Sequence, residues 1–253
     1  MSKSEAETRT QLIDKQLAQA GWDVKDRSQV MLEYEILLGK GIQKSAAIVS
    51  EQAPTYGEFQ YSDYVLLGKN AKPLAVVEAK RTSKDAAMGR EQAKQYCLNI
   101  QKTLDCELPY CFYTNGLETF FWDLDNYPPR KIAGFPTRDD LERFRSLQRN
   151  RKPLTDELIN TKIAGRDYQI RSIRSVLEAI EKKKRECLLV MATGSGKTRI
   201  CIALVDALMR ARHIERVLFL VDRIALREQA LGAMPFGNPR SVTQWRHFSR
   251  APC

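Results

Sequence analysis

The segment CLLVMATGSGKT at residues 187–198 constrains the fold more than any other part of the chain. Its first six residues form a continuous apolar run typical of a buried strand. A glycine-rich loop follows, and then a helical pattern covers residues 199–212. A second apolar run, RVLFLV at 216–221, and a predicted helix at 224–231 complete the segment. Strand, loop, helix, strand and helix in this order predict a parallel α/β unit.

The loop at 193–198 is suited to binding phosphate. Its glycines let backbone N–H groups turn inward around phosphate oxygens, and the helix N-terminus adds its dipole. Lys197 is expected to reach the β- and γ-phosphates of a nucleotide, and Thr198 to offer its hydroxyl to Mg²⁺. The strict form of the motif begins with glycine, where this chain has Met191. The predicted loop contacts are Thr193, Gly194, Ser195, Gly196, Lys197 and Thr198, and the alternative is a fortuitous Gly-Ser-Gly turn.

A second candidate site lies in the segment FQYSDYVLLGKNAKPLAVVEAKR at 59–81. Two short apolar runs, 64–67 and 74–77, flank a turn-forming segment and predict a β-hairpin. Glu78 and Lys80 are two apart and share a face, and Asp63 can lie opposite them on the returning strand. Desolvation makes unpaired charges costly there, and a divalent metal ion between the carboxylates would offset that cost. A surface salt-bridge cluster is the alternative.

Neighbouring helices offer further candidate residues. A helix is predicted over 5–20, with Glu7 near its start, where an acid also favours the helix dipole. Another is predicted over 83–101, and there Gln92 and Tyr96 are four residues apart on one face. Glu7 is therefore a candidate for the charged end of the hairpin, and Gln92 and Tyr96 are either accessory to it or ordinary half-buried helix residues.

The remaining pattern divides the chain in two. Strands are predicted at 109–113 and 118–122, and strand-like or mixed segments at 31–38 and 46–49. Helices are predicted at 139–147, 155–163 and 168–184, and QRNRKP at 148–153 is the candidate linker. Residues 1–150 carry 21 Lys and Arg against 21 Asp and Glu, whereas the excess that gives the net charge of +10 lies in 151–253. This asymmetry favours two domains, 1–150 and 151–253, and either a polyanion partner or a solvated basic surface for the second.

Composition excludes several classes of protein. The sequence has neither a signal peptide nor an apolar stretch of about 18 residues, so we predict a cytoplasmic protein without membrane contact. Six cysteines form no CxxC pair and are expected to be free thiols; an iron–sulfur cluster at Cys97, Cys106 and Cys111 would lack a nearby fourth ligand. Two histidines leave little room for a zinc site or a histidine triad.

Several motifs of the second half resemble the superfamily 2 helicases and translocases. MATGSGKT resembles their motif I, and VLFLVDRIALREQA at 217–230 resembles motif Ia rather than a Walker B strand ending at Asp222. RDYQ at 166–169 resembles the adenine-reading Q motif, which implies nucleotide contacts from Arg166 and Gln169. The resemblance implies ATP as the ligand and a RecA-like lobe. Because no acidic motif pair and no second lobe follow, we expect nucleotide binding by this chain but not a complete motor.

The first half resembles the PD-(D/E)XK nucleases, whose D…ExK core corresponds to Asp63, Glu78 and Lys80. QxxxY at 92–96 resembles an accessory motif of helicase–nuclease enzymes. This implies Mg²⁺ held by Asp63 and Glu78, with Lys80 positioning the attacking water. The order of both motif sets resembles the restriction subunit of Type I restriction–modification enzymes. It implies an α/β fold, cleavage of double-stranded DNA coupled to ATP-driven translocation, and methyltransferase (modification) and specificity subunits as partners.

An alternative function belongs to another class. The chain would then be part of an ATP-dependent nucleic-acid translocase or remodeller, whose N-terminal domain binds a partner without catalysis. In that case the acids of the hairpin splay apart or pair with arginines. In the nuclease they lie close enough to share one ion.

Overall fold

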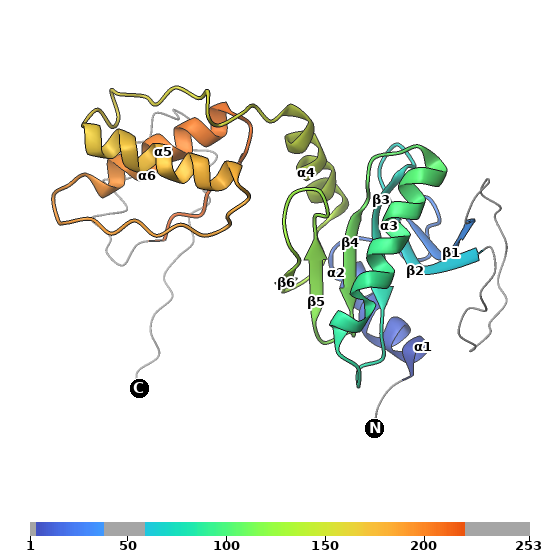
Figure 1. The fold of residues 1–253 in the computed structure, drawn as a ribbon. Helices are drawn as coiled ribbons and strands as arrows, with labels where there is room; N and C mark the ends of the chain where they lie inside the picture. The colour runs from blue at the N-terminus through green and yellow to red at the C-terminus, as the bar shows by residue number, and fades with distance from the viewer. Residues whose placement is uncertain (1–3, 38–58, 221–253) are drawn as a thin grey trace, which may run out of the picture. The chain divides into compact units, whose positions relative to one another are not determined.

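The structure is a computed structural model that describes residues 4–37 and 59–220 (Figure 1). The strand expected at 46–49 and the helix expected at 224–231 lie outside these ranges. By its internal contacts the chain divides into two compact units, Met1–Arg149 and Asn150–Cys253.

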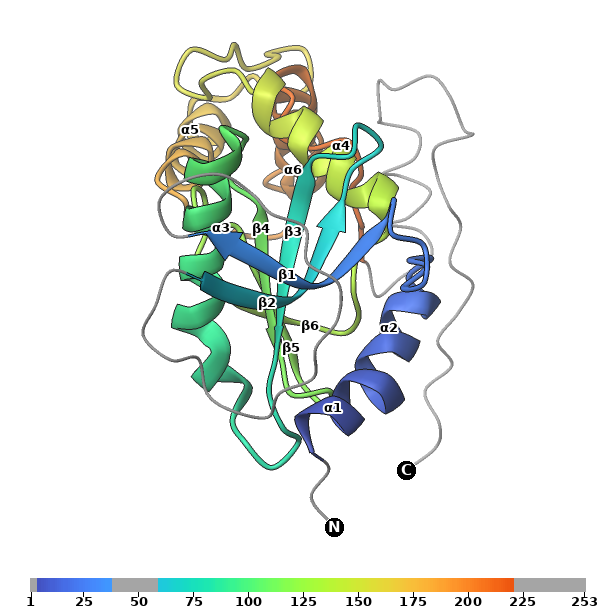
Figure 2. The same cartoon turned by 90° about the vertical axis from the view of Figure 1, so that its right-hand side faces the viewer.

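A mixed sheet of six strands forms the centre of the first unit (Figure 2). The strands lie in chain order, and all neighbours are antiparallel except the parallel pair β3 and β4. Their bounds are β1 Val30–Leu37, β2 Phe59–Leu67, β3 Pro73–Ala79, β4 Tyr110–Thr114, β5 Thr119–Trp122 and β6 Arg130–Ile132. The predicted hairpin is β2 and β3, and the helix-covered sheet confirms the α/β class.

Helices cover both faces of this sheet. The predicted first helix is a continuous run of α1 Glu5–Thr8, a π-helical turn Arg9–Ile13 and α2 Asp14–Gln19. A 3₁₀ turn, Ala86–Gly89, leads into α3 Arg90–Leu104, which joins the parallel strands β3 and β4. The last helix of the first unit, α4 Arg138–Asn150, extends into the segment expected to be a linker.

The alternation of side chains along β2 explains this layering. Tyr64 and Leu66 pack in one core cluster with Ile13 and Leu17 of the first helix. Val65 and Leu67 belong to a second cluster, which includes residues of α3. On that side, Arg90 and Lys94 of α3 lie 4.7 Å and 5.8 Å from the ring centroid of Trp122 on β5, which is 9% exposed. Figure 2 shows α3 and α2 on opposite sides of the sheet.

Two helices pack together in the second unit. They are α5 Asp167–Glu181 and α6 Lys197–Arg210, and they share a core that contains Ile173, Leu177, Ile200 and Ala203. Residues 155–163, which were predicted to be a helix, form turns and irregular chain instead.

The apolar runs at 187–192 and 216–220 form no strand, which contradicts the sequence-based expectation. Leu188 and Val190 are each 87% exposed, and Leu220 is 82% exposed. A buried strand requires neighbouring strands that satisfy its backbone groups. Within the described ranges no segment pairs with these runs, so hydrophobicity alone does not make them strands.

The described part of the chain also shows the state of its cysteines and the hydropathy of its helices. The five cysteines there are all free thiols. Over the same ranges, no helix combines the length and the apolar character needed to span a bilayer.

Candidate functional site

Three carboxylates from three segments of the first unit converge. Glu5 of α1, Asp63 of β2 and Glu78 of β3 each offer an oxygen within 4.8 Å of the other two. Glu78 is 2% exposed, and the Asp63 side chain is 14% exposed. Close, desolvated carboxylates repel one another, so one of them takes up a proton or the group binds a compensating cation.

The end of the β2–β3 ladder positions Asp63. The last paired residues are Tyr64 and Val77, whereas β3 continues beside β4 as far as Ala79. Asp63 Oδ2 accepts a hydrogen bond of 2.7 Å from the Ala79 backbone N–H, in place of a backbone carbonyl. The carboxylate therefore stands where the two strands separate.

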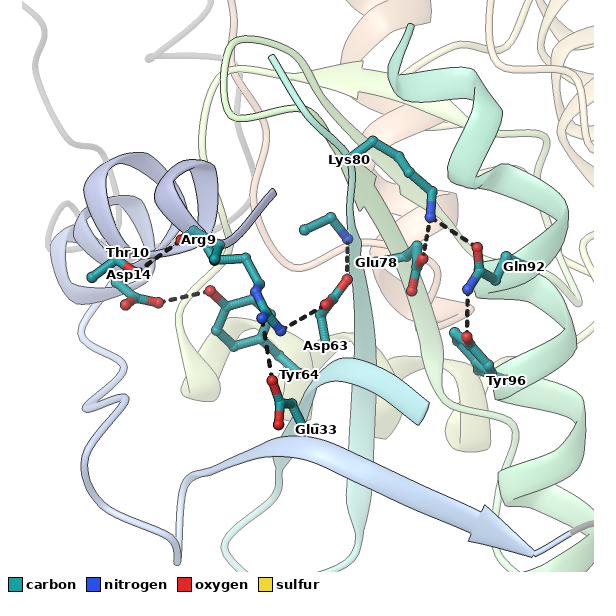
Figure 3. A network of polar contacts seen from close by, with 12 residues as sticks. Arg9, Thr10, Asp14, Glu33, Asp63, Tyr64, Glu78, Lys80, Gln92 and Tyr96 are labelled. Atoms are coloured by element: carbon teal, nitrogen blue, oxygen red, sulfur yellow. Dashed lines mark hydrogen bonds and ion pairs between the residues drawn. The ribbon is translucent and has the colours of Figure 1, made fainter. Parts of the chain in front are cut away.

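A line of polar side chains connects Glu78 to α3 (Figure 3). Lys80 Nζ donates to Glu78 Oε1 at 2.7 Å and to Gln92 Oε1 at 2.8 Å. Gln92 Nε2 in turn donates to the Tyr96 hydroxyl, one helical turn further along α3. The structure thus brings Asp63, Glu78, Lys80, Gln92 and Tyr96 into one neighbourhood.

The electrostatics of the cluster favour a bound cation. Burial and then the charge of Asp63 raise the pKa of Glu78 to about 8, although Lys80 opposes the shift. Burial also raises the pKa of Asp63, although the hydrogen bond from the Ala79 N–H and the charge of Arg9 lower it. For Lys80, burial is the largest single influence and lowers the pKa, but the carboxylates of Glu78, Glu5 and Asp63 together raise it, so the net shift is upward. Burial likewise raises the pKa of the Tyr96 hydroxyl, so it stays protonated.

One oxygen of Glu78 is suited to act as a metal ligand. Glu78 Oε2 is buried, and among the described residues it has no hydrogen-bond partner. A buried carboxylate oxygen without a partner costs free energy, which coordination to a cation would offset. Carboxylate oxygens are also the ligands that Mg²⁺ and Mn²⁺ prefer. The residues present therefore fit a divalent ion.

The first helix contributes Glu5 to the cluster, not Glu7 as the sequence suggested. Glu7 forms a capping box with Ser4: its Oε2 accepts from the Ser4 backbone N–H at 2.8 Å, and its own N–H donates to Ser4 Oγ at 3.2 Å. Because the capping box turns the Glu7 side chain back to the helix start, Glu5 is the acid that meets Asp63 and Glu78.

Gly89 allows the helix to approach this site closely. A Cβ atom at Gly89 would lie 3.1 Å from Glu78 Cγ and 3.4 Å from Lys80 Cγ. The backbone there is right-handed helical, with φ of −83°, so a side chain would be resisted only by these contacts. Sequence inspection did not single out Gly89.

Gly89→Ala should therefore weaken divalent-ion binding by roughly tenfold, because it displaces the Glu78 carboxylate by a few tenths of an ångström. Titration of the variant with Mn²⁺ measures the effect. Gly134→Ala is the matched control, since a Cβ there meets nothing within 4 Å. Equal affinities for the two variants would show that the close approach is unimportant.

The glycine-rich loop at 193–198, the predicted phosphate loop, has a backbone that depends on two of its glycines. Gly194 and Gly196 have φ of +79° and +85°, values that side chains disfavour. Gly196 caps α6, whose first two residues are Lys197 and Thr198. Lys197 Nζ donates to the Met191 carbonyl at 2.9 Å, so the ammonium lies against the loop. Thr193 is exposed.

Gln169 is held behind this loop. Its Nε2 donates to the Ser195 carbonyl at 3.1 Å, and its Oε1 accepts from the Arg166 backbone N–H at 3.3 Å. The Tyr168 hydroxyl donates to the same carbonyl at 2.7 Å, and Arg166 Nη1 donates to that hydroxyl at 3.0 Å. Gln169 is 3% exposed, so reading a base edge would require these contacts to be exchanged.

Four contributors were missed at the sequence level: Glu5, Arg9, Gly89 and Tyr168. The S-x-x-E pattern at residues 4–7 is a capping-box signature, and it could have reassigned Glu7 and left Glu5 as the candidate. Arg9 lies four residues after Glu5 and so on the same helix face. No sequence pattern indicates the close approach of Gly89 to Glu78 and Lys80.

Two family models match the chain. The model described as Type I restriction enzyme R protein N terminus matches residues 40–130, and the model described as Type III restriction enzyme, res subunit, matches residues 162–247. The first range includes Asp63, Glu78 and Lys80, and the second includes Gln169 and the phosphate loop.

Individual relatives are similar along nearly the whole chain. The chain is 30% identical to the Type I restriction enzyme EcoKI endonuclease subunit of Escherichia coli K12, over 92% of this chain and 24% of that subunit. It is 28% identical to the EcoAI endonuclease subunit of Escherichia coli, over 98% of this chain and 31% of that subunit. The chain thus spans about a quarter to a third of these relatives.

A solved structure is also similar, although its TM-score of 0.46 is low. It is a fragment assigned to an HsdR subunit of a type I restriction enzyme from Vibrio vulnificus YJ016, with 26% identity over 84% of this chain and 39% of that chain. The family models and the curated relatives carry the assignment: the chain belongs with the N-terminal part of the restriction subunits of Type I restriction enzymes.

Proposed function

We propose that the first unit is an Mg²⁺-dependent DNA endonuclease of PD-(D/E)XK type. The observation that carries this proposal is the convergence of Glu5, Asp63 and Glu78 within 4.8 Å, with Lys80 bound to Glu78. Asp63 and Glu78, with Glu5 beside them, would hold the ion. Bound there, the ion would supply a water of lowered pKa and neutralise charge on the scissile phosphate.

Each side chain has a separate task in this proposal. Lys80 keeps an ammonium beside the ligand carboxylate, where it can orient a water molecule and stabilise charge that develops on the phosphate. Gln92 fixes the Lys80 ammonium through its carbonyl oxygen, and the Tyr96 hydroxyl fixes the Gln92 amide. Lys80 thus has a defined orientation before substrate binds.

The elevated pKa of Glu78 makes ion binding dependent on pH. Below its pKa of about 8 the carboxyl is protonated, and a proton must leave before the oxygen can bind an ion. We expect the Mn²⁺ affinity of the chain to fall about tenfold for each pH unit below 8 and to level off above it. Isothermal titration between pH 6 and 9 measures this. Glu78→Gln should bind weakly throughout, and an inflection near 8 in that variant would contradict the assignment.

The second unit is proposed to be the beginning of a RecA-like ATPase lobe. The phosphate loop with two left-handed glycines, and its support by Tyr168 and Gln169, favour ATP binding with Mg²⁺ near Thr198. As a restriction subunit, the whole protein would translocate double-stranded DNA and work with methyltransferase and specificity subunits. The EcoKI and EcoAI relatives are endonuclease subunits of Type I restriction enzymes, and this similarity supports methyltransferase and specificity subunits as partners.

The alternative, a remodeller with a non-catalytic N-terminal domain, predicted acids that splay apart or pair with arginines. Asp63 does pair with an arginine, Arg9, at 2.9 Å. The carboxylates nevertheless converge, and Glu78 Oε2 stays without a partner among the described residues. The nuclease proposal accounts for the convergence of the carboxylates and for the Glu78 oxygen without a partner.

A further inference from the structure

We infer that Arg9 is a positioning residue that takes the place of a second cation, so that the carboxylate cluster accepts a single divalent ion. This inference rests on the proposed metal centre and specifies how many ions it holds. Arg9 is the only arginine or lysine of the first helix that the structure joins to the cluster within the described ranges.

The geometry places Arg9 and Glu78 on different sides of the Asp63 carboxylate (Figure 3). Arg9 Nη1 donates to Asp63 Oδ1 at 2.9 Å, while Asp63 Oδ2 faces the Ala79 N–H. In Figure 3, Arg9 and Glu78 lie on opposite sides of the Asp63 carboxylate. An ion shared with Glu78 therefore approaches from one side, and the guanidinium fills the other.

Glu33 strengthens this arrangement. It stands opposite Asp63 in the β1–β2 register, between the pairs Leu32–Tyr64 and Tyr34–Ser62, and Arg9 Nη2 donates to its Oε1 at 3.2 Å. The backbone of Glu33 is left-handed, with φ of 47°, which is uncommon for a residue with a side chain. Two carboxylates on one side of the sheet are thus bridged by one guanidinium, as a metal ion would bridge them.

The charge of the cluster matches one divalent ion. Four carboxylates, Glu5, Glu33, Asp63 and Glu78, face two side-chain cations, Arg9 and Lys80. When all six groups are ionised, two negative charges remain. A second divalent ion would raise the net charge of this partly buried site to +2 and would approach the guanidinium, which is unfavourable. Without Arg9 a second ion would leave a net charge of only +1 and would meet no guanidinium.

Arg9 is part of the first helix, but other contacts also hold that helix. The Tyr64 hydroxyl donates to Asp14 Oδ1 at 2.7 Å, and Gln16 Nε2 donates to the Gly116 carbonyl at 2.8 Å. Tyr64→Phe therefore removes one anchor of the helix without changing the charge of the cluster, which makes it the matched control for replacement of Arg9.

The test is a count of Mn²⁺ ions bound to the whole chain at pH 9 without nucleotide, by electron paramagnetic resonance. The doubly substituted Asp63→Asn, Glu78→Gln chain gives the background. We expect one ion above background for the unsubstituted chain and for Tyr64→Phe, and two for Arg9→Gln. Arg9→Lys, which keeps the charge, should bind one, and thermal unfolding confirms that each variant is folded.

The outcomes separate this inference from the proposed function. Two ions in the unsubstituted chain, or one ion in a folded Arg9→Gln chain, would overturn the role of Arg9 and leave the nuclease centre standing. A second ion in Tyr64→Phe would show that loosening the helix is sufficient and would also overturn it. No ion above background in the unsubstituted chain would overturn the metal centre itself.

Discussion

Replacing Lys80 with alanine is expected to reduce DNA cleavage by at least about a thousandfold, with little change in ATP binding. The substitution removes the ammonium that contacts Glu78 at 2.7 Å and that would stabilise charge on the phosphate. Loss of one preorganised donor to a developing charge typically costs a hundred- to a thousandfold in rate. Here the Glu78 carboxylate also loses a cation that favours its ionised form. Cleavage of circular DNA by the assembled restriction enzyme measures the effect.

Lys84→Ala is the matched control for this experiment. Lys84 is an exposed lysine four residues further along the chain, and its substitution removes the same charge outside the carboxylate cluster. Cleavage should stay within about twofold of the unsubstituted enzyme. If the Lys80→Ala enzyme still cleaves DNA at a comparable rate, the nuclease site is assigned wrongly.

The second large effect is expected at Lys197. Lys197→Ala should weaken ATP binding to the chain by about a hundredfold, because a point charge that would pair with the β- and γ-phosphates is lost. In the assembled enzyme it should also stop cleavage that depends on translocation. Binding of a fluorescent ATP analogue measures the first effect, and Lys184→Ala, an exposed lysine outside the loop, is the control.

The two substitutions should be independent, since they lie in different compact units. Lys80→Ala should retain ATP affinity, and Lys197→Ala should retain Mn²⁺ binding by the carboxylate cluster. A variant that loses both would indicate unfolding rather than the loss of one site. Unchanged ATP affinity after Lys197→Ala would contradict the proposed role of the phosphate loop.

Local patterns predicted much of the first unit. The hairpin at 64–77 followed from two apolar runs around turn-forming residues, and the positions of Glu78 and Lys80 followed from the two-residue period of a strand. The backbone of the strand itself sets this period, so it does not depend on which strands lie beside it. The four-residue spacing of Gln92 and Tyr96 likewise placed both on one face of a helix, where their side chains form a hydrogen bond.

Predictions that depended on distant partners were weaker. The run at 187–192 is as apolar as a buried strand, but a strand also needs backbone partners, and the described residues provide none. The exchange of Glu5 for Glu7 depended on a hydrogen bond that competes for the Glu7 side chain. Arg9 shares a helix face with Glu5, but its partners could not be assigned, because its contacts to Glu33 and Asp63 span 24 and 54 residues of sequence.

The position of Arg90 and Lys94 over Trp122 gives the protein an intrinsic optical reporter. The indole sits under two cations of α3, the helix that also carries Gln92 and Tyr96. An anionic ligand that draws either cation away would change the emission of that indole. With Trp22 and Trp245 replaced by phenylalanine, Trp122 would be the single tryptophan of the chain, and its fluorescence would follow events on this helix in real time.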